Sequence, residues 1–547
     1  MHLSYDHGTG AAPLLGQTLG QALNSAARRF GARDALVSCH QNVRYSYADL
    51  LHEVNRAAKA MLALGVQRGD RVGIWSPNNA EWTINQYAAA KAGAVLVNVN
   101  PAYRTRELQH ALRHSGVSVL VSARGFRNAD YAQMVAELAP ALPALRHVVY
   151  LGDAAPPSGL AWADFLTLGD GLSDGDLARR EALLQFDDAV NIQYTSGTTG
   201  SPKGATLSHH NILNNGYFVG EALHYSEEDR ICLPVPFYHC FGCVLGNMAA
   251  VTHGSAIVLP GESFDPEATL RAIHTERCTS IYGVPTMFIA ELNHAAFDTF
   301  CLESLRTGIM AGAPCPVDVM RRVIDRMHAR AVTICYGMTE TSPVSFQSAA
   351  DDPLEMRVST VGRVHPHVEC KIIDPQTGEI VPRGTRGELC TRGYIVMLGY
   401  WDDAAATARA VDAARWMHTG DLATMNEDGY VSISGRIDDM IIRGGENIYP
   451  REIEEFLHTH PKIAQASVVG VPDRHYGEQV CAWIARRDGE TVTVDEVREF
   501  CKGRIATYKI PRYVLFTSDF PMTVTGKIQK FRMREISIEE LGLEVRQ

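Results

Sequence analysis

The residues best suited to phosphate chemistry occupy one short stretch, residues 195–204, with the sequence TSGTTGSPKG. Its three glycines let backbone N–H groups turn toward an anion, and five hydroxyls and one ammonium group surround the same space. The glycine spacing is not that of a P-loop, which disfavours P-loop kinase or GTPase chemistry. Composition alone leaves open a flexible hydroxyl-rich loop. The residues predicted to bind phosphate are Thr195, Ser196, Gly197, Thr198, Thr199, Gly200 and Lys203.

Two further strings each combine a glycine with an acidic residue. Residues 336–341 read YGMTET and directly follow an apolar run. Tyr336 could stack on a base there, and Glu340 could hold a metal ion bound to phosphate. Residues 416–421 read WMHTGD, in which Asp421 could accept hydrogen bonds from both hydroxyls of a ribose. Taken alone, the first string is more simply explained by an aromatic core residue at Tyr336. The second is more simply explained by an aspartate in a turn at Asp421.

The C-terminal part carries glycines next to charges. Residues 435–439 read GRIDD and residues 443–447 read RGGEN, which suits a pivot followed by a close backbone approach to a ligand. Lys527 follows a glycine and could act as a mobile point charge. A solvated turn and a solvated surface lysine are the alternatives for these strings.

Two other patterns could suggest redox, metal-binding or hydrolytic chemistry, but the surrounding sequence does not support it. Cys240 and Cys243 form C-x-x-C, but no second pair accompanies them, so the pattern predicts two packed thiols. His209 and His210 stand near no nucleophile elbow, so no Ser-His-Asp hydrolase is predicted.

Alternating helix and strand patterns must position these strings. Ser46 can cap a helix whose apolar residues recur at helical spacing until Gly65. Strands at 72–75, 94–99 and 117–122 then alternate with helices at about 80–92 and 104–114. Strands joined by helices of this length predict parallel sheets covered on both faces, that is, an α/β fold.

The chain is too long for one hydrophobic core, which stops growing near ~250–300 residues. Between 366 and 435, strand-like runs separated by turn residues predict a small β unit resembling a barrel. Strands near 466–469, 480–485 and 513–517 and a helix near 494–504 predict an α+β end piece. We therefore expect an N-terminal domain at 1–436, which includes the β unit, and a C-terminal domain at 437–547.

Composition narrows the function classes. A net charge of −11 argues against a nucleic-acid partner, which would select a basic face. The N-terminus lacks a secretory signal, and no stretch of ~18 apolar residues predicts an integral membrane segment. The twelve cysteines lack disulfide-like spacing, which favours a reducing, cytoplasmic location. The sequence leaves open whether the chain forms a homo-oligomer.

Taken together, the five motifs resemble in order and spacing the adenylate-forming superfamily of acyl-CoA synthetases, adenylation domains and luciferases. The resemblance runs from residue 45 to residue 527, and residues 387–401, 440–450 and 528–534 look closest to the medium-chain acyl-CoA ligase branch. It implies an ATP-dependent enzyme that joins a carboxylic acid to coenzyme A through an acyl-adenylate, with ATP, Mg²⁺ and coenzyme A as cofactors.

The resemblance also implies roles in adenylation. The loop at 195–204 would grip the β- and γ-phosphates, and Thr195 and Glu340 would contact Mg²⁺. Lys527 would contact the α-phosphate and the substrate carboxylate, and His239 would line the acyl pocket. The residues implied around the nucleoside are Gly312, Ala313, Pro314, Tyr336, Gly337, Thr339, Asp421 and Arg436.

A second set of implied roles concerns the thioester step. Members of this superfamily rotate a mobile C-terminal domain between the two half-reactions, and Asp438 matches the pivot position. Rotation would withdraw Lys527 and bring Gly444 and Gly445 to the pantetheine channel, where a side chain would obstruct passage.

The predicted substrate is a short- or medium-chain fatty acid. Amino-acid adenylation domains place an aspartate near the position of Tyr238, whereas residues 238–241 read YHCF and hold no carboxylate. Branched, aryl and thioether acids stay open, as does an acceptor other than coenzyme A, such as a carrier protein or oxygen. A catalytically inactive nucleotide-binding protein is the alternative from outside the enzymes.

Overall fold

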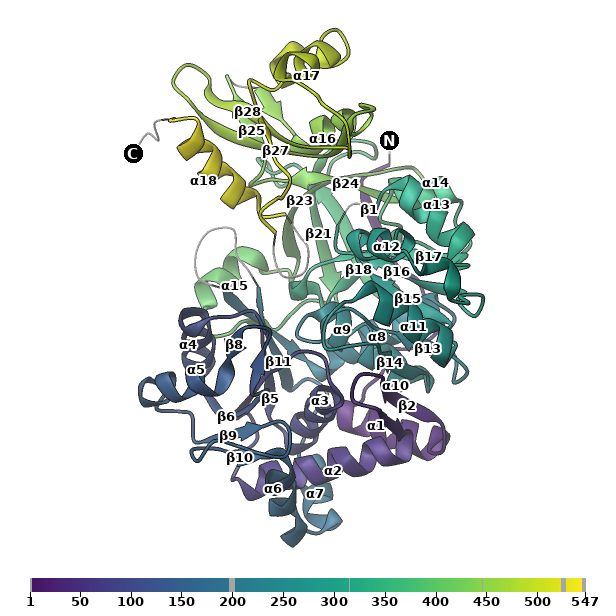
Figure 1. Cartoon of the computed structure of the whole chain (residues 1–547), viewed down its shortest axis with the longest axis vertical. Helices are drawn as coiled ribbons and strands as arrows, with labels where there is room; N and C mark the ends of the chain where they lie inside the picture. Colours follow the sequence, from purple (N-terminus) through teal and green to yellow (C-terminus); the bar gives the residue numbers. More distant parts are fainter. Residues whose placement is uncertain (1, 196–201, 314, 445, 523–527, 544–547) are drawn as a thin grey trace. The chain divides into compact units, whose positions relative to one another are not determined.

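The computed structural model describes residues 2–195, 202–313, 315–444, 446–522 and 528–543. The chain forms two compact units. The large unit comprises Asp6–Cys370 and Thr391–Met417, and the small unit comprises Met1–Tyr5, Lys371–Cys390 and His418–Gln547. Figure 1 follows the chain in colour through the elements of each unit. The predicted border between residues 436 and 437 differs from this division and stays a prediction.

One sheet of the large unit has the strand order β10-β9-β6-β4-β5-β11-β12-β22. Its centre is parallel, whereas β12 pairs antiparallel with both β11 and β22. Strands 72–75, 94–99 and 117–122 of the sequence prediction are confirmed within a residue or so. The strands are β4 Arg71–Trp75, β5 Val95–Val99, β6 Val117–Ser122, β9 His147–Tyr150, β10 Leu160–Ala161, β11 Ala189–Thr195, β12 Lys203–Ser208 and β22 Gly399–Tyr400.

The second sheet of the large unit has nine strands in the order β19-β18-β17-β16-β15-β13-β14-β2-β3. The six central strands run parallel, in the order β2, β14, β13, β15, β16 and β17. Antiparallel strands lie on the two outer sides of the sheet. The strands are β2 Asp34–Ser38, β3 Val43–Ser46, β13 Arg230–Cys232, β14 Ala256–Leu259, β15 Ser280–Gly283, β16 Thr307–Ala311, β17 Ala331–Gly337, β18 Val344–Gln347 and β19 Arg363–Val364.

Local signals set the helix ends. Ser46 and Asp49 form a capping box at the start of α2, and Asn79 caps α3, which ends at Gly93 with φ +77°. The main helices of this unit are α1 Leu19–Phe30, α2 Tyr47–Ala63, α3 Ala80–Ala92, α4 Thr105–Ser115, α5 Tyr131–Leu138, α6 Trp162–Thr167, α7 Asp174–Glu181, α8 His209–Ala222, α9 Cys240–Cys243, α10 Asn247–His253, α11 Pro266–Glu276, α12 Pro285–Leu292, α13 Val317–Arg326, α14 Leu354–Ser359 and α15 Ala404–Ala410.

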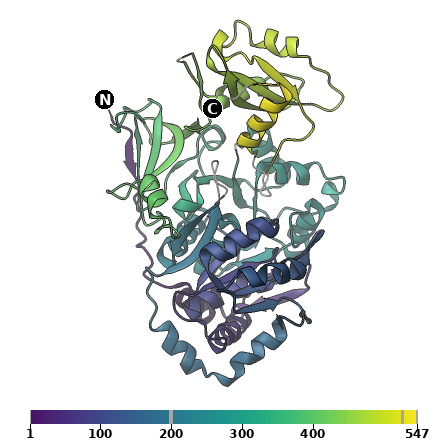
Figure 2. The same ribbon diagram turned by 90° about the vertical axis from the view of Figure 1, so that its left-hand side faces the viewer.

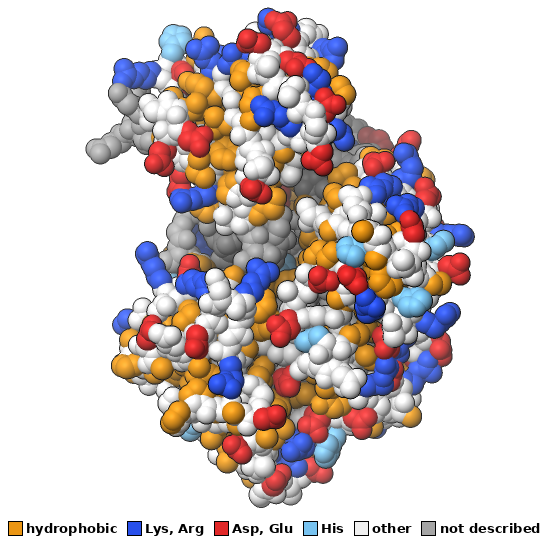
Figure 3. Space-filling model, in the orientation of Figure 1, with side chains coloured by type: hydrophobic (Ala, Val, Ile, Leu, Met, Phe, Trp, Pro, Cys, Tyr) orange, Lys and Arg blue, Asp and Glu red, His pale blue; other side chains and the backbone are white. Residues whose placement is uncertain are grey.

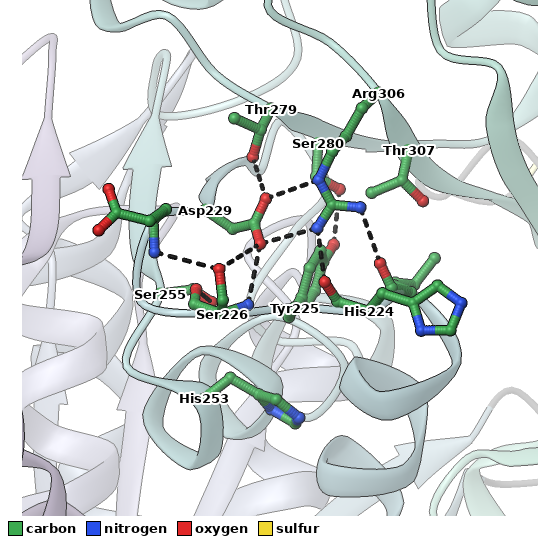
Figure 4. Close-up of polar contacts among 12 residues, drawn as sticks. His224, Tyr225, Ser226, Asp229, His253, Ser255, Thr279, Ser280, Arg306 and Thr307 are labelled. Atoms are coloured by element: carbon green, nitrogen blue, oxygen red, sulfur yellow. Dashed lines mark hydrogen bonds and ion pairs between the residues drawn. The ribbon is translucent and has the colours of Figure 1, made fainter.

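A polar network lies where the parallel strands of the nine-stranded sheet begin (Figure 4). We call this end of the sheet the amino edge, and the end where the strands finish the carboxyl edge. Asp229, Thr279 and Arg306 directly precede β13, β15 and β16, which are neighbours in the sheet. The Asp229 carboxylate accepts hydrogen bonds from Thr279 Oγ1 at 2.6 Å and from Arg306 Nε at 3.0 Å and Nη2 at 2.7 Å. Arg306 also donates to the backbone oxygen of His224, so this edge is tied together inside the protein.

A five-stranded sheet in the order β1-β20-β21-β23-β24 corresponds to the predicted β unit. The division into compact units falls within β1, β20, β21 and β23. Strands β23 and β24 are antiparallel and pair Asp421 with Arg436. The strands are β1 Tyr5–His7, β20 Val368–Ile373, β21 Gly387–Gly393, β23 Met417–Met425 and β24 Val431–Arg436.

The C-terminal α+β piece is built on the order β26-β25-β28-β27, with β29 beside β28. Figure 2 shows the ribbon of this piece in olive to yellow. Alternate residues of β27 and β28 face opposite sides: Val468 packs with α16 and α17, whereas Val469 packs with α18. The predicted α+β class is thereby confirmed. The elements are β25 Ile441–Arg443, β26 Glu446–Ile448, α16 Pro450–His458, β27 Ile463–Asp473, β28 Gly477–Arg486, α17 Val494–Cys501, β29 Tyr513–Phe516 and α18 Lys530–Glu540.

Two general features concern compartment and surface. Among the described residues, no helix has both the length and the apolar character needed to cross a bilayer. No disulfide joins any two of the twelve cysteines, all of which the structure describes. On the visible face of the large unit, basic and acidic side chains are interspersed rather than separated (Figure 3).

Candidate functional site

The two ends of the predicted phosphate-binding loop lie side by side. Thr195 ends β11 and pairs with Lys203, which begins β12, and Thr195 Oγ1 lies 3.4 Å from the backbone oxygen of Lys203. The ammonium group of Lys203 stands 5.1 Å from the centre of the Tyr400 ring. The antiparallel pair therefore fixes the base of the loop. Its predicted phosphate ligands Ser196, Gly197, Thr198, Thr199 and Gly200 lie outside the described residues.

Glu340 lies in a short 3-10 turn, Thr339–Thr341, that follows β17. Its side chain is buried, with 6% of the residue exposed. The Tyr400 hydroxyl donates a hydrogen bond to Glu340 Oε1 at 2.8 Å, and the N–H of Met397 donates to the Glu340 backbone oxygen at 2.9 Å. A buried carboxylate fixed at one oxygen is a suitable ligand for a hard cation.

The predicted adenine-binding residues come from two neighbouring strands. Strands β16 and β17 are parallel, so Gly312 and Tyr336 both lie at their carboxyl ends, where α/β sheets bind ligands. Gly312 has φ +86°, which favours glycine. At Gly337 a Cβ atom would lie 1.7 Å from the backbone oxygen of Pro343, so only glycine fits. Ala313 is exposed beside Gly312, and Pro314 lies outside the described residues.

His239 reaches the same region from another element. It caps the short helix α9, and its Nδ1 accepts the Phe241 N–H at 3.1 Å, which leaves the ring proton of the neutral form on Nε2. Cys240 Sγ lies 3.9 Å from Thr339 Oγ1, next to Glu340. Burial raises the pKa of the Cys240 thiol to about 12, so it is a packed thiol and no nucleophile.

His209, the other histidine weighed for catalysis, is structural. Its Nδ1 accepts the backbone N–H of Leu19 at 3.1 Å. Burial lowers the pKa of His209 to about 4, so the ring stays neutral at physiological pH. The sequence inference that no hydrolytic triad involves this residue agrees with that position.

In the small unit, Asp421 and Arg436, the residues predicted to bind ribose, contact each other. Arg436 Nε donates to Asp421 Oδ1 at 3.2 Å, between paired positions of β23 and β24. Glu388 supports the residues of β23 that precede Asp421: its Oε1 accepts the Gly420 N–H at 3.2 Å, and its Oε2 lies 3.0 Å from His418 Nδ1. Sequence reasoning missed Glu388, which lies more than thirty positions upstream.

Glu388, Cys390 and His418 also form the one group of three metal-capable side chains found among the described residues. Cys390 Sγ lies 3.6 Å from His418 Nδ1. Because the Glu388 carboxylate already accepts from Gly420 and faces His418, we assign this group to holding the start of β23, just before Asp421.

Gly444 has a structural reason to be glycine. Its φ is +59°, and a Cβ atom there would lie 3.0 Å from the Tyr476 ring. Its N–H donates to the Tyr476 backbone oxygen at 2.8 Å. This geometry accounts for the residue type without a pantetheine channel, whose predicted lining by Gly444 stays a prediction. Gly445 and Lys527 lie outside the described residues.

The large unit thus combines a glycine-rich sequence between two paired strands with a buried carboxylate at the carboxyl ends of a second sheet, which suits an adenylating enzyme. The chain belongs to the AMP-binding enzyme family, which matches residues 23–401, and the AMP-binding enzyme C-terminal domain matches residues 452–527. It is an AMP-forming acid–thiol ligase that uses ATP, Mg²⁺ and coenzyme A.

Individual relatives sharpen this placement. YngI of Bacillus subtilis (strain 168), whose name assigns it to the acyl-CoA synthetases, is 47% identical over 97% of this chain and 99% of its own length. The mitochondrial medium-chain acyl-CoA ligase ACSF2 of Danio rerio is 46% identical over 99% of this chain and 91% of its own. The crystal structure of the anthranilate CoA ligase AuaEII with anthranoyl-AMP superposes with a TM-score of 0.85 at 25% identity, over 97% and 99% of the two chains.

The donors present fit a magnesium ion bound to nucleotide. Glu340 offers a buried carboxylate oxygen and Thr195 a hydroxyl at the start of the loop, and both are hard oxygen ligands. When bound, the ion would supply charge neutralisation to the phosphates of ATP.

Proposed function

We propose that this ligase converts a short- or medium-chain fatty acid, about C4 to C12, to its acyl-CoA. A carboxylate oxygen of the acid attacks the α-phosphorus of ATP, and pyrophosphate leaves. The sulfur of coenzyme A then attacks the carbonyl carbon of the acyl-adenylate, AMP leaves, and the thiol proton passes to solvent. The acid is ionised at neutral pH, so the first step needs no general base.

One observation carries the adenylation step: Gly312, Tyr336 and Glu340 gather at the carboxyl ends of β16 and β17. Thr195 and Lys203 would hold phosphate there, and Asp421 and Arg436 would bind the ribose hydroxyls. We assign contact with the α-phosphate to Lys527, because a cation there offsets the charge of two anions that meet.

The fatty-acid assignment rests on apolar residues that the family resemblance places along the acyl pocket. Phe241, Val244 and Val344 belong to one buried apolar cluster, and Phe241 stacks on Tyr282 with ring centres 5.7 Å apart. An aliphatic chain gains about 0.8 kcal/mol for each CH₂ that it buries against such a surface. The name of the Danio rerio relative, a medium-chain acyl-CoA ligase, points the same way.

A panel of acids tests the substrate assignment. Acid-dependent exchange of labelled pyrophosphate into ATP, measured with butyrate, octanoate, dodecanoate, isovalerate and anthranilate, should be fastest with an unbranched acid. The likeness to an anthranilate CoA ligase makes the aryl acid the second candidate. If exchange is faster with anthranilate, the proposed substrate becomes an aryl acid in place of a fatty acid. Absence of exchange with every acid would refute the ligase assignment.

Half-reactions test the division of labour between domains. We propose that residues 437–547 form the mobile domain and that Asp438 is its pivot. Lys527→Ala should abolish adenylation and spare thioester formation from supplied acyl-adenylate, whereas Gly445→Trp should do the reverse. Equal loss of both half-reactions in either variant would contradict the two-state scheme.

We also propose a cytoplasmic location, because a chain with twelve unbridged cysteines suits a reducing compartment. Fractionation of the producing cells, followed by detection of the chain in the cytosolic fraction, tests it.

A further inference from the structure

Residues 397–401 join the strand after the phosphate-binding loop to the turn that carries Glu340. Strand β22 pairs with β12, and the N–H of Trp401 donates to the Gly204 oxygen at 2.7 Å. Four residues earlier, the N–H of Met397 donates to the Glu340 oxygen at 2.9 Å. The phosphate-binding loop, this segment and Glu340 lie far apart in the sequence, so the sequence alone does not show that they are in contact. In space, one short segment holds both.

The side chain of Tyr400 repeats this bridge with charges at both ends. Its hydroxyl donates to Glu340 Oε1 at 2.8 Å, and its ring lies 5.1 Å below the ammonium group of Lys203. Because Glu340 is buried, the hydrogen bond acts in low-dielectric surroundings and is strengthened there. The ring face offers its negative potential to the lysine.

Neighbouring groups fix the position of this tyrosine. Its N–H donates to Thr407 Oγ1 at 2.8 Å, and Thr407 lies in α15. The preceding Gly399 has φ +154°, and a Cβ atom there would lie 2.9 Å from Thr407 Cγ2. The glycine is therefore needed to bring the chain against α15, which sets the direction of the phenol.

We propose that Tyr400 is a positioning residue for adenylation: it orients the Glu340 carboxylate for the metal and holds Lys203 at the phosphate loop. The terminal torsion of a glutamate is broad, so a carboxylate bound at Oε1 loses the freedom to turn Oε2 away from a metal. The inference rests on the proposed function, which gives Glu340 the metal and Lys203 the phosphate.

Tyr400→Phe removes the hydroxyl and keeps the ring. In octanoate-dependent pyrophosphate exchange, the Mg²⁺ concentration at half-maximal rate should rise about 10- to 100-fold, as for other groups that orient a metal ligand. Thioester formation from supplied acyl-adenylate should change less than about twofold, because that step does not use the metal. Tyr217→Phe, in α8, is the matched control and should change neither.

Two combinations separate positioning from a general effect on the fold. In a Glu340→Gln background, Tyr400→Phe should add no further loss, since the hydroxyl acts through the carboxylate. Tyr400→Leu should raise KM for ATP a few-fold beyond Tyr400→Phe, because the ring under Lys203 is lost. This inference would be wrong if the losses from Glu340→Gln and Tyr400→Phe multiplied. It would also be wrong if an active Tyr400→Phe enzyme kept the same Mg²⁺ concentration at half-maximal rate. Either result would leave the proposed function standing. Absence of exchange in the unmodified enzyme would overturn the proposed function and this inference with it.

Discussion

The two edges of the nine-stranded sheet use carboxylates in opposite ways. At the amino edge, Asp229 accepts hydrogen bonds from Thr279, Arg306 and the N–H of Ser226, and 4% of its side chain is exposed. At the carboxyl edge, Glu340 is nearly as buried, but among the described residues only the Tyr400 hydroxyl donates to its carboxylate.

The difference separates stability from function within one sheet. Each oxygen of a carboxylate can accept two hydrogen bonds, so Asp229 is close to saturated by the protein and Glu340 keeps acceptor capacity. A saturated buried carboxylate stabilises the fold, whereas spare capacity in a buried carboxylate costs free energy unless a ligand uses it. Asp229 therefore stabilises the fold at the amino edge, whereas the unused acceptor capacity of Glu340 supports the proposal that the carboxyl edge binds a ligand.

The largest expected effect falls on the carboxyl edge. Glu340→Gln keeps the size of the side chain and removes its charge, so pyrophosphate exchange should fall about 100- to 1000-fold, as when one preorganised electrostatic contact is lost. The free energy of unfolding in urea should stay the same or rise, since no buried charge remains. A large loss of stability with a modest loss of rate would mean that Glu340 stabilises the fold, as Asp229 does, and does not bind the metal.

Asp229→Ala should show the reverse. Removal of the carboxylate leaves the Arg306 guanidinium, whose side chain is 40% exposed, without its anion at the sheet edge. We expect the free energy of unfolding to fall by about 2–3 kcal/mol, below the full cost of breaking a buried pair because solvent reaches the arginine.

The control for Asp229→Ala is activity per folded molecule. Exchange rate divided by the folded fraction should match that of the unmodified enzyme. A changed Mg²⁺ dependence in this variant would mean that the amino edge also shapes the site, and the contrast between the edges would fail.

A third buried carboxylate, Glu291 in α12, sharpens the comparison by pH. It is 1% exposed, both its oxygens lack a hydrogen-bond partner among the described residues, and burial raises its pKa well above the ordinary 4.5. The folded state therefore keeps the proton that the unfolded state loses, and stability falls as pH rises above 4.5 by at most about 1.4 kcal/mol per pH unit.

Glu291→Met removes this dependence and should raise the free energy of unfolding at pH 7 by about 1–3 kcal/mol, with little change near pH 4. Asp229 has the opposite sign. Burial alone would raise its pKa, but hydrogen bonds from Arg306 and Thr279 outweigh burial and hold the pKa of Asp229 below its ordinary value. Its contribution is present at neutral pH and is lost as pH falls. Urea unfolding of both variants from about pH 2 to pH 8 checks the two slopes, because the slope from Asp229 lies mainly below its ordinary pKa of 3.8.

Local signals made much of the fold predictable. Asn79 and Gly93 bound α3 at 80–92, where the sequence prediction placed it, because a side-chain cap and a left-handed glycine are encoded within a few residues. The predicted helix at 494–504 ends instead at Cys501, since Gly503 adopts φ +69°. The predicted strand at 466–469 is part of the longer β27, whose ends are set by pairing with β28.

Contacts between distant segments were not predictable. Tyr400 and Glu340 are separated by sixty positions, and Asp229 and Arg306 by seventy-seven. No periodicity or spacing connects such residues, because tertiary packing alone brings them together. Residue types in short motifs identified Glu340, whereas the tyrosine that orients it carries no local signature beyond the glycine before it.

The smallest expected effect compares one hydroxyl at each edge. Thr279 Oγ1 donates to Asp229 and accepts the Arg230 N–H at 3.0 Å, so Thr279→Val removes a donor and leaves an amide without its acceptor. The free energy of unfolding should fall by about 1–2 kcal/mol, with exchange per folded molecule unchanged, and Thr279→Ser should restore most of the stability. Tyr400→Phe deletes the same kind of donor from the other edge and should change the Mg²⁺ dependence with little loss of stability. If both variants lost stability to the same degree and neither altered exchange, the two edges would be equivalent, and neither carboxylate could be assigned to the site by its unused acceptor capacity.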